Sequence, residues 1–150
     1  MIIDTSALVA VLLREPEALA YSRLVRAAPA RRLSAASYVE LSAVIDGRRD
    51  AVLSSALDEL LLAWRIEIAP LSVQQARLAR DAYQRFGRGS GHPAQLNMGD
   101  CFSYALARDL GEPLLFKGSD FALTDIEMLV EPVKSRRLSE VLASYGAEPA

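Results

Sequence analysis

The chain has very little cysteine and histidine, and each scarcity excludes a class of site. Cys101 is the only cysteine among 150 residues, so neither an internal disulfide nor a cysteine-rich zinc site can form. This composition fits a reducing compartment. His92 is the only histidine, and a hydrolase built on it and Cys101 is conceivable. The local signatures of such enzymes are absent, however, and a lone cysteine beside Phe102 is more often a packed small hydrophobe.

Long hydrophobic runs are also missing. The apolar stretch 7–13 is far shorter than the roughly 20 residues that a membrane helix needs. It follows an aspartate and has no basic segment before it, unlike a secretory signal peptide. We therefore expect no membrane association and a cytoplasmic location.

An excess of basic charge is the third absence. The formal net charge is −2 and the isoelectric point is about 5.5, which argues against broad, nonspecific nucleic-acid binding. A local basic rim around a small site is still compatible with these values. So is a metal ion that supplies the positive charge itself.

The remaining composition is that of one globular domain. The chain is 51% hydrophobic and 24% charged, and it has no internal repeat, low-complexity tract or linker. We expect a single domain over 1–150, with its core in about 1–132 and a C-terminal segment, possibly helical, in 133–150.

Short apolar strands alternate with amphipathic helices along the chain. This alternation predicts an α/β fold with a mostly parallel central sheet of four to five short strands flanked by helices. Ser72 is a good N-cap, Gly111 a helix stop, and the glycine-rich stretch 87–97 the one obvious loop. Strands are expected at 1–4, 32–34, 67–70, 113–116 and, more weakly, 128–130; helices are expected at 5–13, 15–28, 37–48, 51–64, 73–86, 100–110 and 137–145.

Four acids stand beside apolar or small residues instead of in solvated charge runs: Asp4, Glu40, Asp100 and Asp120. Carboxylates next to a core are costly unless they are paired, hydrogen-bonded or holding a metal. Asp4 ends the first strand and Asp120 follows the fourth, and function collects at such strand ends in parallel sheets. If the fold brings the four acids together, they suit a hard divalent cation. The alternative is that the aspartates only cap helices and Glu40 lies on the surface.

Four segments carry a family resemblance, and they span nearly the whole chain in order: Ile3–Ala7, Ser37–Glu40, Gly99–Ala107 and Leu115–Phe121. Together they resemble the PIN-domain family and, more narrowly, the VapC toxins of bacterial toxin–antitoxin pairs. The resemblance implies a ribonuclease dependent on Mg²⁺ or Mn²⁺ whose acidic site is formed by the four acids. It also implies a supporting hydroxyl from Thr5 or Ser6. Ser119 departs from the pattern, because many relatives carry a second polar or acidic residue there.

For this site we expect Asp4 and Asp100 to bind the metal directly. Glu40 and Asp120 would bind it directly or through water, or would help to activate the nucleophile. The reaction implied is hydrolysis of RNA phosphodiester bonds, which would inhibit translation and growth. Candidate phosphate-binding cations, by sequence neighbourhood alone, are Lys117, Arg14, Arg85 and Arg88; each could equally be an ordinary solvated charge.

The resemblance implies two protein partners, a cognate VapB-like antitoxin and a second copy of the toxin. An apolar stripe on helix 51–64 is expected to be mostly core, with part of it available to a partner helix: Leu53, Leu57, Leu60, Leu61 and Trp64.

Two other functions stay open from the residues alone. One is a metal-dependent phosphatase that acts on a small phosphate ester, and the other is a catalytically silent binding module. The loop 87–91 does not indicate nucleotide binding, because it lacks the Lys-Ser/Thr ending of a phosphate loop.

Overall fold

The fold is built on a four-stranded parallel sheet with the order β3-β2-β1-β4. In the computed structural model, which describes residues 1–129, the strands are β1 (Ile2–Ile3), β2 (Arg32–Ser34), β3 (Glu67–Ala69) and β4 (Leu114–Leu115). Ile2 pairs with Arg32 on one side and with Leu114 on the other. The predicted α/β class and parallel sheet are confirmed.

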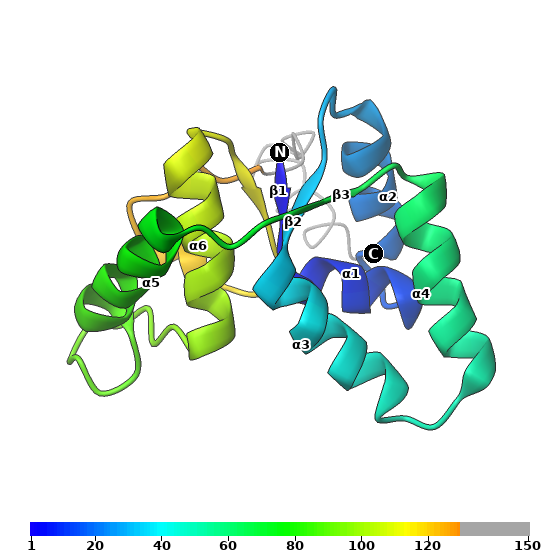
Figure 1. Ribbon diagram of the computed structural model, residues 1–150, viewed down its shortest axis with the longest axis horizontal. Coiled ribbons are helices and arrows are strands. Elements are labelled where there is room, and N and C mark those ends of the chain that lie inside the picture. The colour runs from blue at the N-terminus through cyan, green and yellow to red at the C-terminus, as the bar shows by residue number, and fades with distance from the viewer. Residues whose placement is uncertain (130–150) are drawn as a thin grey trace, which may run out of the picture.

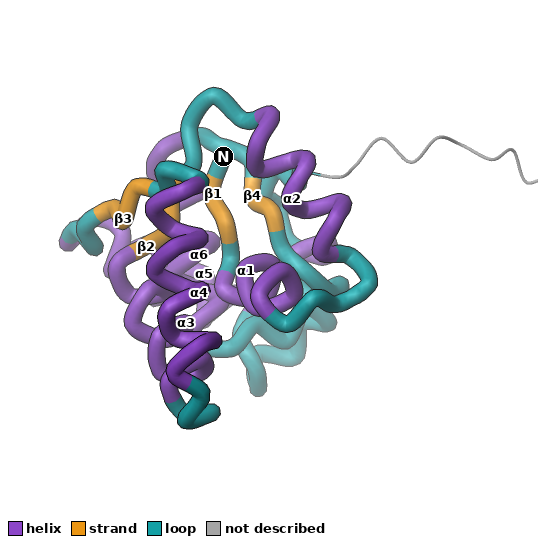
Figure 2. Tube along the Cα trace, turned by 90° about the vertical axis from the view of Figure 1, so that its right-hand side faces the viewer, coloured by secondary structure: helices purple, strands orange, loops and turns teal. Residues whose placement is uncertain are grey.

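Helices cover both faces of this sheet (Figure 1). They are α1 (Thr5–Leu12), α2 (Ala18–Ala27), α3 (Ala35–Asp46), α4 (Ala51–Ala63), α5 (Val73–Phe86) and α6 (Met98–Leu110), followed by a short 3₁₀ helix at Phe121–Leu123. Helices α5 and α6 pack on one face, and α1 to α4 lie on the other; Figure 2 looks towards the face covered by α1 to α4 and shows the strands side by side.

Strands β1 and β4 are apolar along their whole length because both of their faces are buried. Ile2 and Leu114 point into the core shared with α5 and α6, whereas Ile3 and Leu115 point into the core shared with α1, α3 and α4. Successive strand residues face opposite sides of a sheet, so neighbouring isoleucines and leucines supply both cores. This explains why β1 and β4 are continuous apolar runs in the sequence instead of alternating ones.

Local capping sets the helix ends near the sheet. The Ser72 side chain accepts a hydrogen bond from the Gln75 N–H and so caps α5, as predicted. Gly111 ends α6 with φ 62°, a left-handed conformation that glycine adopts without steric cost. Asp50 caps α4 through the N–H groups of Val52 and Leu53.

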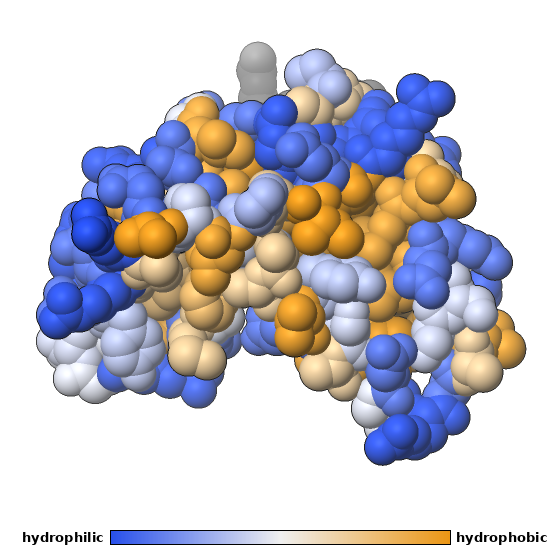
Figure 3. Space-filling model, viewed as in Figure 1, coloured by the Kyte–Doolittle hydropathy of each residue, from blue (hydrophilic) through white to orange (hydrophobic). Residues whose placement is uncertain are grey.

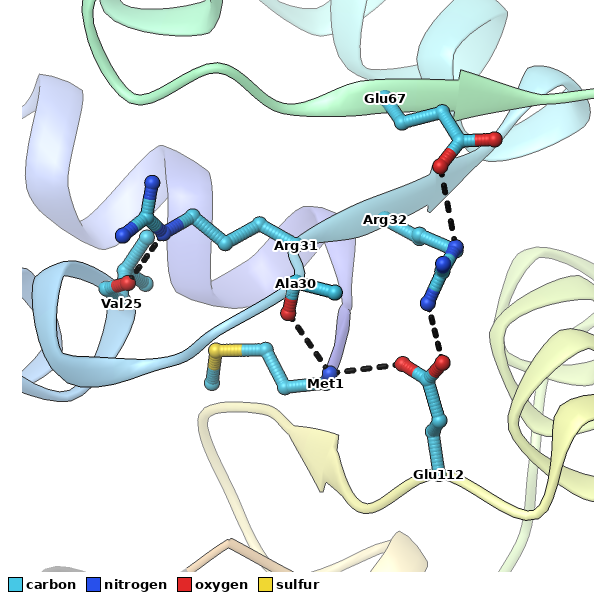
Figure 4. A network of polar contacts seen from close by, with 7 residues as sticks. All are labelled: Met1, Val25, Ala30, Arg31, Arg32, Glu67 and Glu112. Carbon is cyan, nitrogen blue, oxygen red and sulfur yellow. Dashed lines mark hydrogen bonds and ion pairs between the residues drawn. The ribbon is translucent and has the colours of Figure 1, made fainter.

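An ion-pair network ties the amino-terminal edge of the sheet (Figure 4). The Met1 ammonium donates to the Ala30 carbonyl at 2.8 Å and to Glu112 at 2.7 Å. Glu112 also pairs with Arg32, which in turn pairs with Glu67 at 3.0 Å. The network therefore links three strands and the turn before the fourth, and its charges are balanced at this edge.

Several expected bounds need adjustment, and one expected helix falls outside the described part. The helix expected at 15–28 begins at Ala18, and the helix expected at 37–48 lies at Ala35–Asp46. The weak strand expected at 128–130 is reduced to one parallel bridge between Met128 and Leu114. The helix expected at 100–110 begins two residues earlier, at Met98. The helix expected at 137–145, like the whole segment 133–150, lies outside the described residues. Within residues 1–129, no helix is long and apolar enough to cross a membrane.

Candidate active site

The predicted acids lie at the carboxyl edge of the parallel sheet. Asp4 directly follows β1, Asp120 follows β4, and Glu40 lies in α3, which begins where β2 ends. Asp100 lies in the first turn of α6. The space-filling view is hollowed on this side of the molecule, between the lobe of α5 and α6 and the lobe of α3 and α4 (Figure 3).

Asp4 is the most enclosed of the acids, with 4% of its surface exposed. Its Oδ2 accepts hydrogen bonds from the Ser6 N–H at 2.9 Å and from Ser6 Oγ at 2.6 Å. Its Oδ1 accepts from Ser103 Oγ at 2.6 Å. Asp4 is thus the N-cap of α1 and also lies in the acid cluster, so its capping role is compatible with the predicted metal-binding role.

Buried hydroxyls surround this carboxylate. Ser103 Oγ lies 3.3 Å from Ser37 Oγ, and both residues are fully buried. Ser34 ends the neighbouring strand β2, and its buried Oγ has no hydrogen-bond partner among the described residues. Of the buried polar residues in the described chain, only Gln75 lies elsewhere. Buried polarity is therefore concentrated at the carboxyl edge.

Sequence reasoning missed Ser37 and Ser103, although a signal was present. Each lies one helical turn from a predicted acid, Ser37 before Glu40 and Ser103 after Asp100. Residues three apart share a helix face, so a serine at that spacing on an otherwise apolar face points toward the same site.

Glu40 reaches the site from α3 and touches two other elements. Its Oε2 accepts a hydrogen bond from Thr5 Oγ1 at 3.1 Å. A Cβ built on Gly99 would lie 2.3 Å from Glu40 Oε1, so the carboxylate lies directly against the backbone of α6. Burial raises the pKa of Glu40, the Thr5 hydrogen bond opposes this rise, and the charge of Asp4 adds to it. Both predicted hydroxyls are used, Thr5 on Glu40 and Ser6 on Asp4.

Asp100 takes part in a capping box at the start of α6. The Asn97 N–H donates to Asp100 Oδ2 at 2.7 Å, and the Asp100 N–H donates to Asn97 Oδ1 at 2.9 Å. Burial raises the pKa of Asp100 to about 6 against the opposing hydrogen bond from Asn97. The charges of Asp4, Asp120 and Glu40 raise it further. The four acids thus form one electrostatic group.

Asp120 is the exposed member of the group. It occupies the N-cap position of the 3₁₀ helix, but its side chain makes no capping hydrogen bond. Its carboxylate is therefore not committed to the protein backbone. Ser119 beside it is exposed as well.

No lysine or arginine of the described residues forms an ion pair with any of the four acids. The clustered oxygens are the hard ligands that Mg²⁺ and Mn²⁺ prefer. Over residues 1–129, however, no three acidic, cysteine or histidine side chains form a ready-made metal-binding group. The acidic oxygens are thus the right type of ligand for a hard cation, but the side chains lie too far apart to coordinate one without moving.

The predicted cations contact other groups instead of the acids. Lys117 Nζ pairs with Glu15 and Glu17, and only the Lys117 N–H reaches the site, where it donates to Ser6 Oγ at 3.0 Å. Arg85 pairs with Asp81 at 3.3 Å and with Asp125 at 2.9 Å.

The other two predicted cations are exposed. Arg14 follows the end of α1 with φ 55°. Arg88 donates from Nε to the Gln95 carbonyl within the glycine-rich loop. A phosphate-binding role for any of the four cations stays a prediction.

The structure disfavours a catalytic pair of Cys101 and His92. Burial raises the pKa of the Cys101 thiol to about 12, and the charge of Asp100 adds to this rise, so the nucleophilic thiolate is suppressed. His92 packs its ring edge-on against Phe86 at 4.9 Å, and its Nδ1 accepts a hydrogen bond from the Ala94 N–H. Both residues thus have structural contacts.

A parallel α/β domain with acids gathered at one sheet edge is the architecture of a known class. The family model of the PIN domain matches residues 1–127. Ribonuclease VapC28 of Mycobacterium tuberculosis is 54% identical over 131 residues, covering 87% of this chain and 98% of the relative. Ribonuclease VapC of Mycolicibacterium smegmatis is 48% identical over 126 residues, covering 84% and 97%. The chain therefore belongs to the PIN domain family, in its group of VapC ribonucleases.

Solved structures share the fold at low sequence identity. The crystal structure of Mycobacterium tuberculosis VapC20, titled a sarcin-ricin loop cleaving toxin, superposes with a TM-score of 0.66 at 17% identity, covering 85% of this chain and 97% of that one. VapBC2 of Rickettsia felis, bound to a DNA fragment from its promoter, gives a TM-score of 0.66 at 13% identity, covering 86% and 96%. These likenesses confirm the fold.

Proposed function

We propose that this chain is a Mg²⁺- or Mn²⁺-dependent endoribonuclease and the toxin of a VapBC-type toxin–antitoxin pair. The ribonuclease activity is supported by relatives named VapC ribonuclease at 46–54% identity over most of their length. The role as a toxin is supported by structural relatives that include a toxin–antitoxin complex from Klebsiella pneumoniae. The dependence on metal is our inference from the site.

One observation carries the metal dependence: four carboxylates share one edge of the sheet without a protein cation paired to them in the described chain. Such a cluster repels itself and would repel a phosphodiester. A divalent cation bound there neutralises this charge, lowers the pKa of a water molecule and stabilises the leaving oxygen.

The protein's own contribution is to hold the oxygens in place. Ser6 and Ser103 fix the orientation of the Asp4 carboxylate, which makes it a suitable direct ligand. Asp100 keeps one oxygen in the capping box and leaves Oδ1 for a ligand. Burial raises the pKa of Glu40 and Thr5 orients its carboxylate, so we assign Glu40 the role of accepting a proton from the attacking water. The exposed Asp120 would complete the site on the substrate side.

An apolar groove offers a place for the antitoxin. The helix stripe predicted at 51–64 is mostly core: Leu57, Leu61 and Trp64 are buried, and Leu53 and Leu60 pack partly buried against them. A different set faces outward beside it: Leu62 is 81% exposed and Ile68 41% exposed. These two residues line a groove between α4 and β3, which we call the α4–β3 groove. Apolar residues gather over this part of the surface in Figure 3. We propose that an apolar segment of the antitoxin binds there.

The function is tested by comparing two substrate classes with one protein. The purified chain should cleave RNA in the presence of Mn²⁺ and leave a chromogenic phosphate monoester intact, and Asp100→Asn should not cleave RNA. Turnover of the ester without RNA cleavage would identify a phosphatase instead. Absence of Mn²⁺ binding by calorimetry would point to the silent binding module.

The RNA target requires a cellular experiment. Mapping of RNA 5′ ends after induced expression should reveal new ends that an Asp4→Asn control lacks. The homodimer stays a prediction. Light scattering at micromolar concentration tests it, and a monomeric mass there would contradict it.

A further inference from the structure

Gly99 is an unusual choice for its position. It lies in the first turn of α6, between the exposed Met98 and the acidic Asp100. Glycine is among the least favourable residues inside a helix, because it loses the most backbone freedom on folding. Its φ lies outside the left-handed range that only glycine adopts easily, in contrast to Gly111 at the end of the same helix. The backbone therefore does not require a glycine here.

The space beside Gly99 explains the choice. A Cβ at this position would lie 2.3 Å from Glu40 Oε1, 2.5 Å from Oε2 and 2.6 Å from Cδ. The whole carboxylate of Glu40 therefore occupies the volume that any other side chain would fill. Thr5 holds the same carboxylate from the opposite element, α1, through the 3.1 Å hydrogen bond to Oε2. The partly buried Glu40 carboxylate is thus confined between α1 and α6.

We propose that Gly99 is a positioning residue of the active site, whose missing side chain lets the Glu40 carboxylate lie against α6 beside Asp100. The proposal rests on the proposed ribonuclease function, in which Glu40 handles the nucleophile. Gly99 has no side chain with which to bind substrate or metal. It acts through Glu40, because an added methyl group would displace that carboxylate by about 1 Å before reaching an ordinary contact distance.

The test variant is Gly99→Ala, and it separates positioning from folding. Alanine favours the helix, and the atoms it would meet belong to the flexible end of a side chain, so thermal stability should not fall. The rate constant kcat for RNA cleavage should nevertheless fall by about 10- to 100-fold, with KM little changed, because a displacement of this size at a reacting group costs that much. Met98→Ala, in the same helical turn, is the matched control and should cleave like the wild type.

A double-mutant cycle tests whether the effect of Gly99→Ala on kcat depends on the position of the Glu40 carboxylate. Glu40→Asp shortens the side chain by one methylene and withdraws the carboxylate from the Gly99 position. In that background the additional change Gly99→Ala should lower kcat by less than about 3-fold. An undiminished 10- to 100-fold loss in the Glu40→Asp background would overturn the proposal. So would a folded Gly99→Ala protein that cleaves RNA like the wild type.

A structural readout keeps this proposal distinct from the proposed function. Crystal structures of the wild type and Gly99→Ala should show the Glu40 carboxylate moved by about 1 Å away from α6. If the wild type fails to cleave any RNA but the carboxylate moves, the ribonuclease function fails and the geometric role of Gly99 survives. If the carboxylate does not move, the positioning role itself is refuted.

Discussion

Replacing Asp100 by asparagine should make the metal-free protein more stable while abolishing its activity. Asparagine has nearly the same shape, and its side-chain oxygen can still accept the capping hydrogen bond from the Asn97 N–H. What the substitution removes is a negative charge next to Asp4, Asp120 and Glu40. Stability should therefore rise while activity is lost. This combination distinguishes the removal of electrostatic repulsion from a general folding defect, which would lower both.

The magnitude follows from the pKa. Burial, together with the three neighbouring charges, raises the pKa of Asp100 from 3.8 to about 6. A raised carboxyl pKa means that the folded state favours the protonated form. The stabilisation is full below the unfolded pKa and is lost as the pH rises through about 6. At 1.36 kcal/mol per pKa unit the cost of ionisation above that pH is about 3 kcal/mol, and partial solvent exposure reduces it to about 1 kcal/mol.

The assay is thermal unfolding in chelator at two pH values. At pH 7.5 the Asp100→Asn protein should melt about 2–4 °C above the wild type, as expected for about 1 kcal/mol in a chain of this size. At pH 5 the wild-type carboxyl is largely protonated in the folded state but ionised in the unfolded chain, so the difference should fall to about half, and it should vanish only below the unfolded pKa of 3.8. Adding Mn²⁺ should then raise the melting temperature of the wild type far more than that of the variant.

Two outcomes would refute this reasoning. One is a variant that is no more stable than the wild type at pH 7.5, since the repulsion would then be absent. The other is an equal gain at pH 5 and pH 7.5, because a gain that does not depend on ionisation cannot come from charge. Asp58→Asn on the exposed face of α4 is the matched control and should shift neither curve.

The remaining predictions concern the hydroxyls, the amino edge and the groove. Ser103→Ala should lower the free energy of unfolding by about 1–3 kcal/mol in denaturant titrations, because the buried Asp4 carboxylate loses a hydrogen-bond donor. Ser34→Ala is the control and should change the free energy of unfolding by less than about 0.5 kcal/mol, because that hydroxyl has no partner in the described chain. An equal loss in both variants would contradict the hydroxyl assignment. Glu112→Gln should cost about 1 kcal/mol in the same assay by weakening the pairs with the N-terminal ammonium and an arginine, and the cost should shrink at high salt. Leu62→Lys should abolish binding of the antitoxin in a co-purification assay while RNA cleavage persists. Val73→Lys on α5, at a residue that is 70% exposed, is the control and should bind the antitoxin normally. Retained binding by Leu62→Lys would mean that the antitoxin binds another surface.

Local sequence signals predicted most of the fold. Apolar runs located β1 and β4, short strand candidates located β2 and β3, and Ser72 and Gly111 marked helix ends. The alternation of strands and helices predicted the parallel sheet but not the order of its strands. The fifth strand was overestimated, because Met128 forms only one bridge, to Leu114, and is 37% exposed.

The acids were predictable, but their surroundings were not. Asp4 and Asp100 stand out in the sequence because Asp4 follows an apolar strand and Asp100 begins a predicted helix. The contact of Glu40 with Gly99 joins residues far apart in the chain, and only the packing of α3 against α6 creates it. The same holds for Lys117, which sequence neighbourhood placed beside a phosphate but which pairs with Glu15 from a distant segment. Long-range pairs depend on how elements pack, and no local pattern encodes them.

The balanced ion pairs at the amino edge have a consequence for how this fold tolerates change. Strand β1 has two residues, so the Met1–Glu112 network and the acid cluster lie within about 10 Å of each other along the strand direction. The ion-pair network and the acid cluster nevertheless share no side chain. Substitutions that strengthen the amino edge can therefore raise thermostability without altering a single group at the acidic edge. Variants of this scaffold can gain tolerance to heat there while the self-repelling acids remain intact.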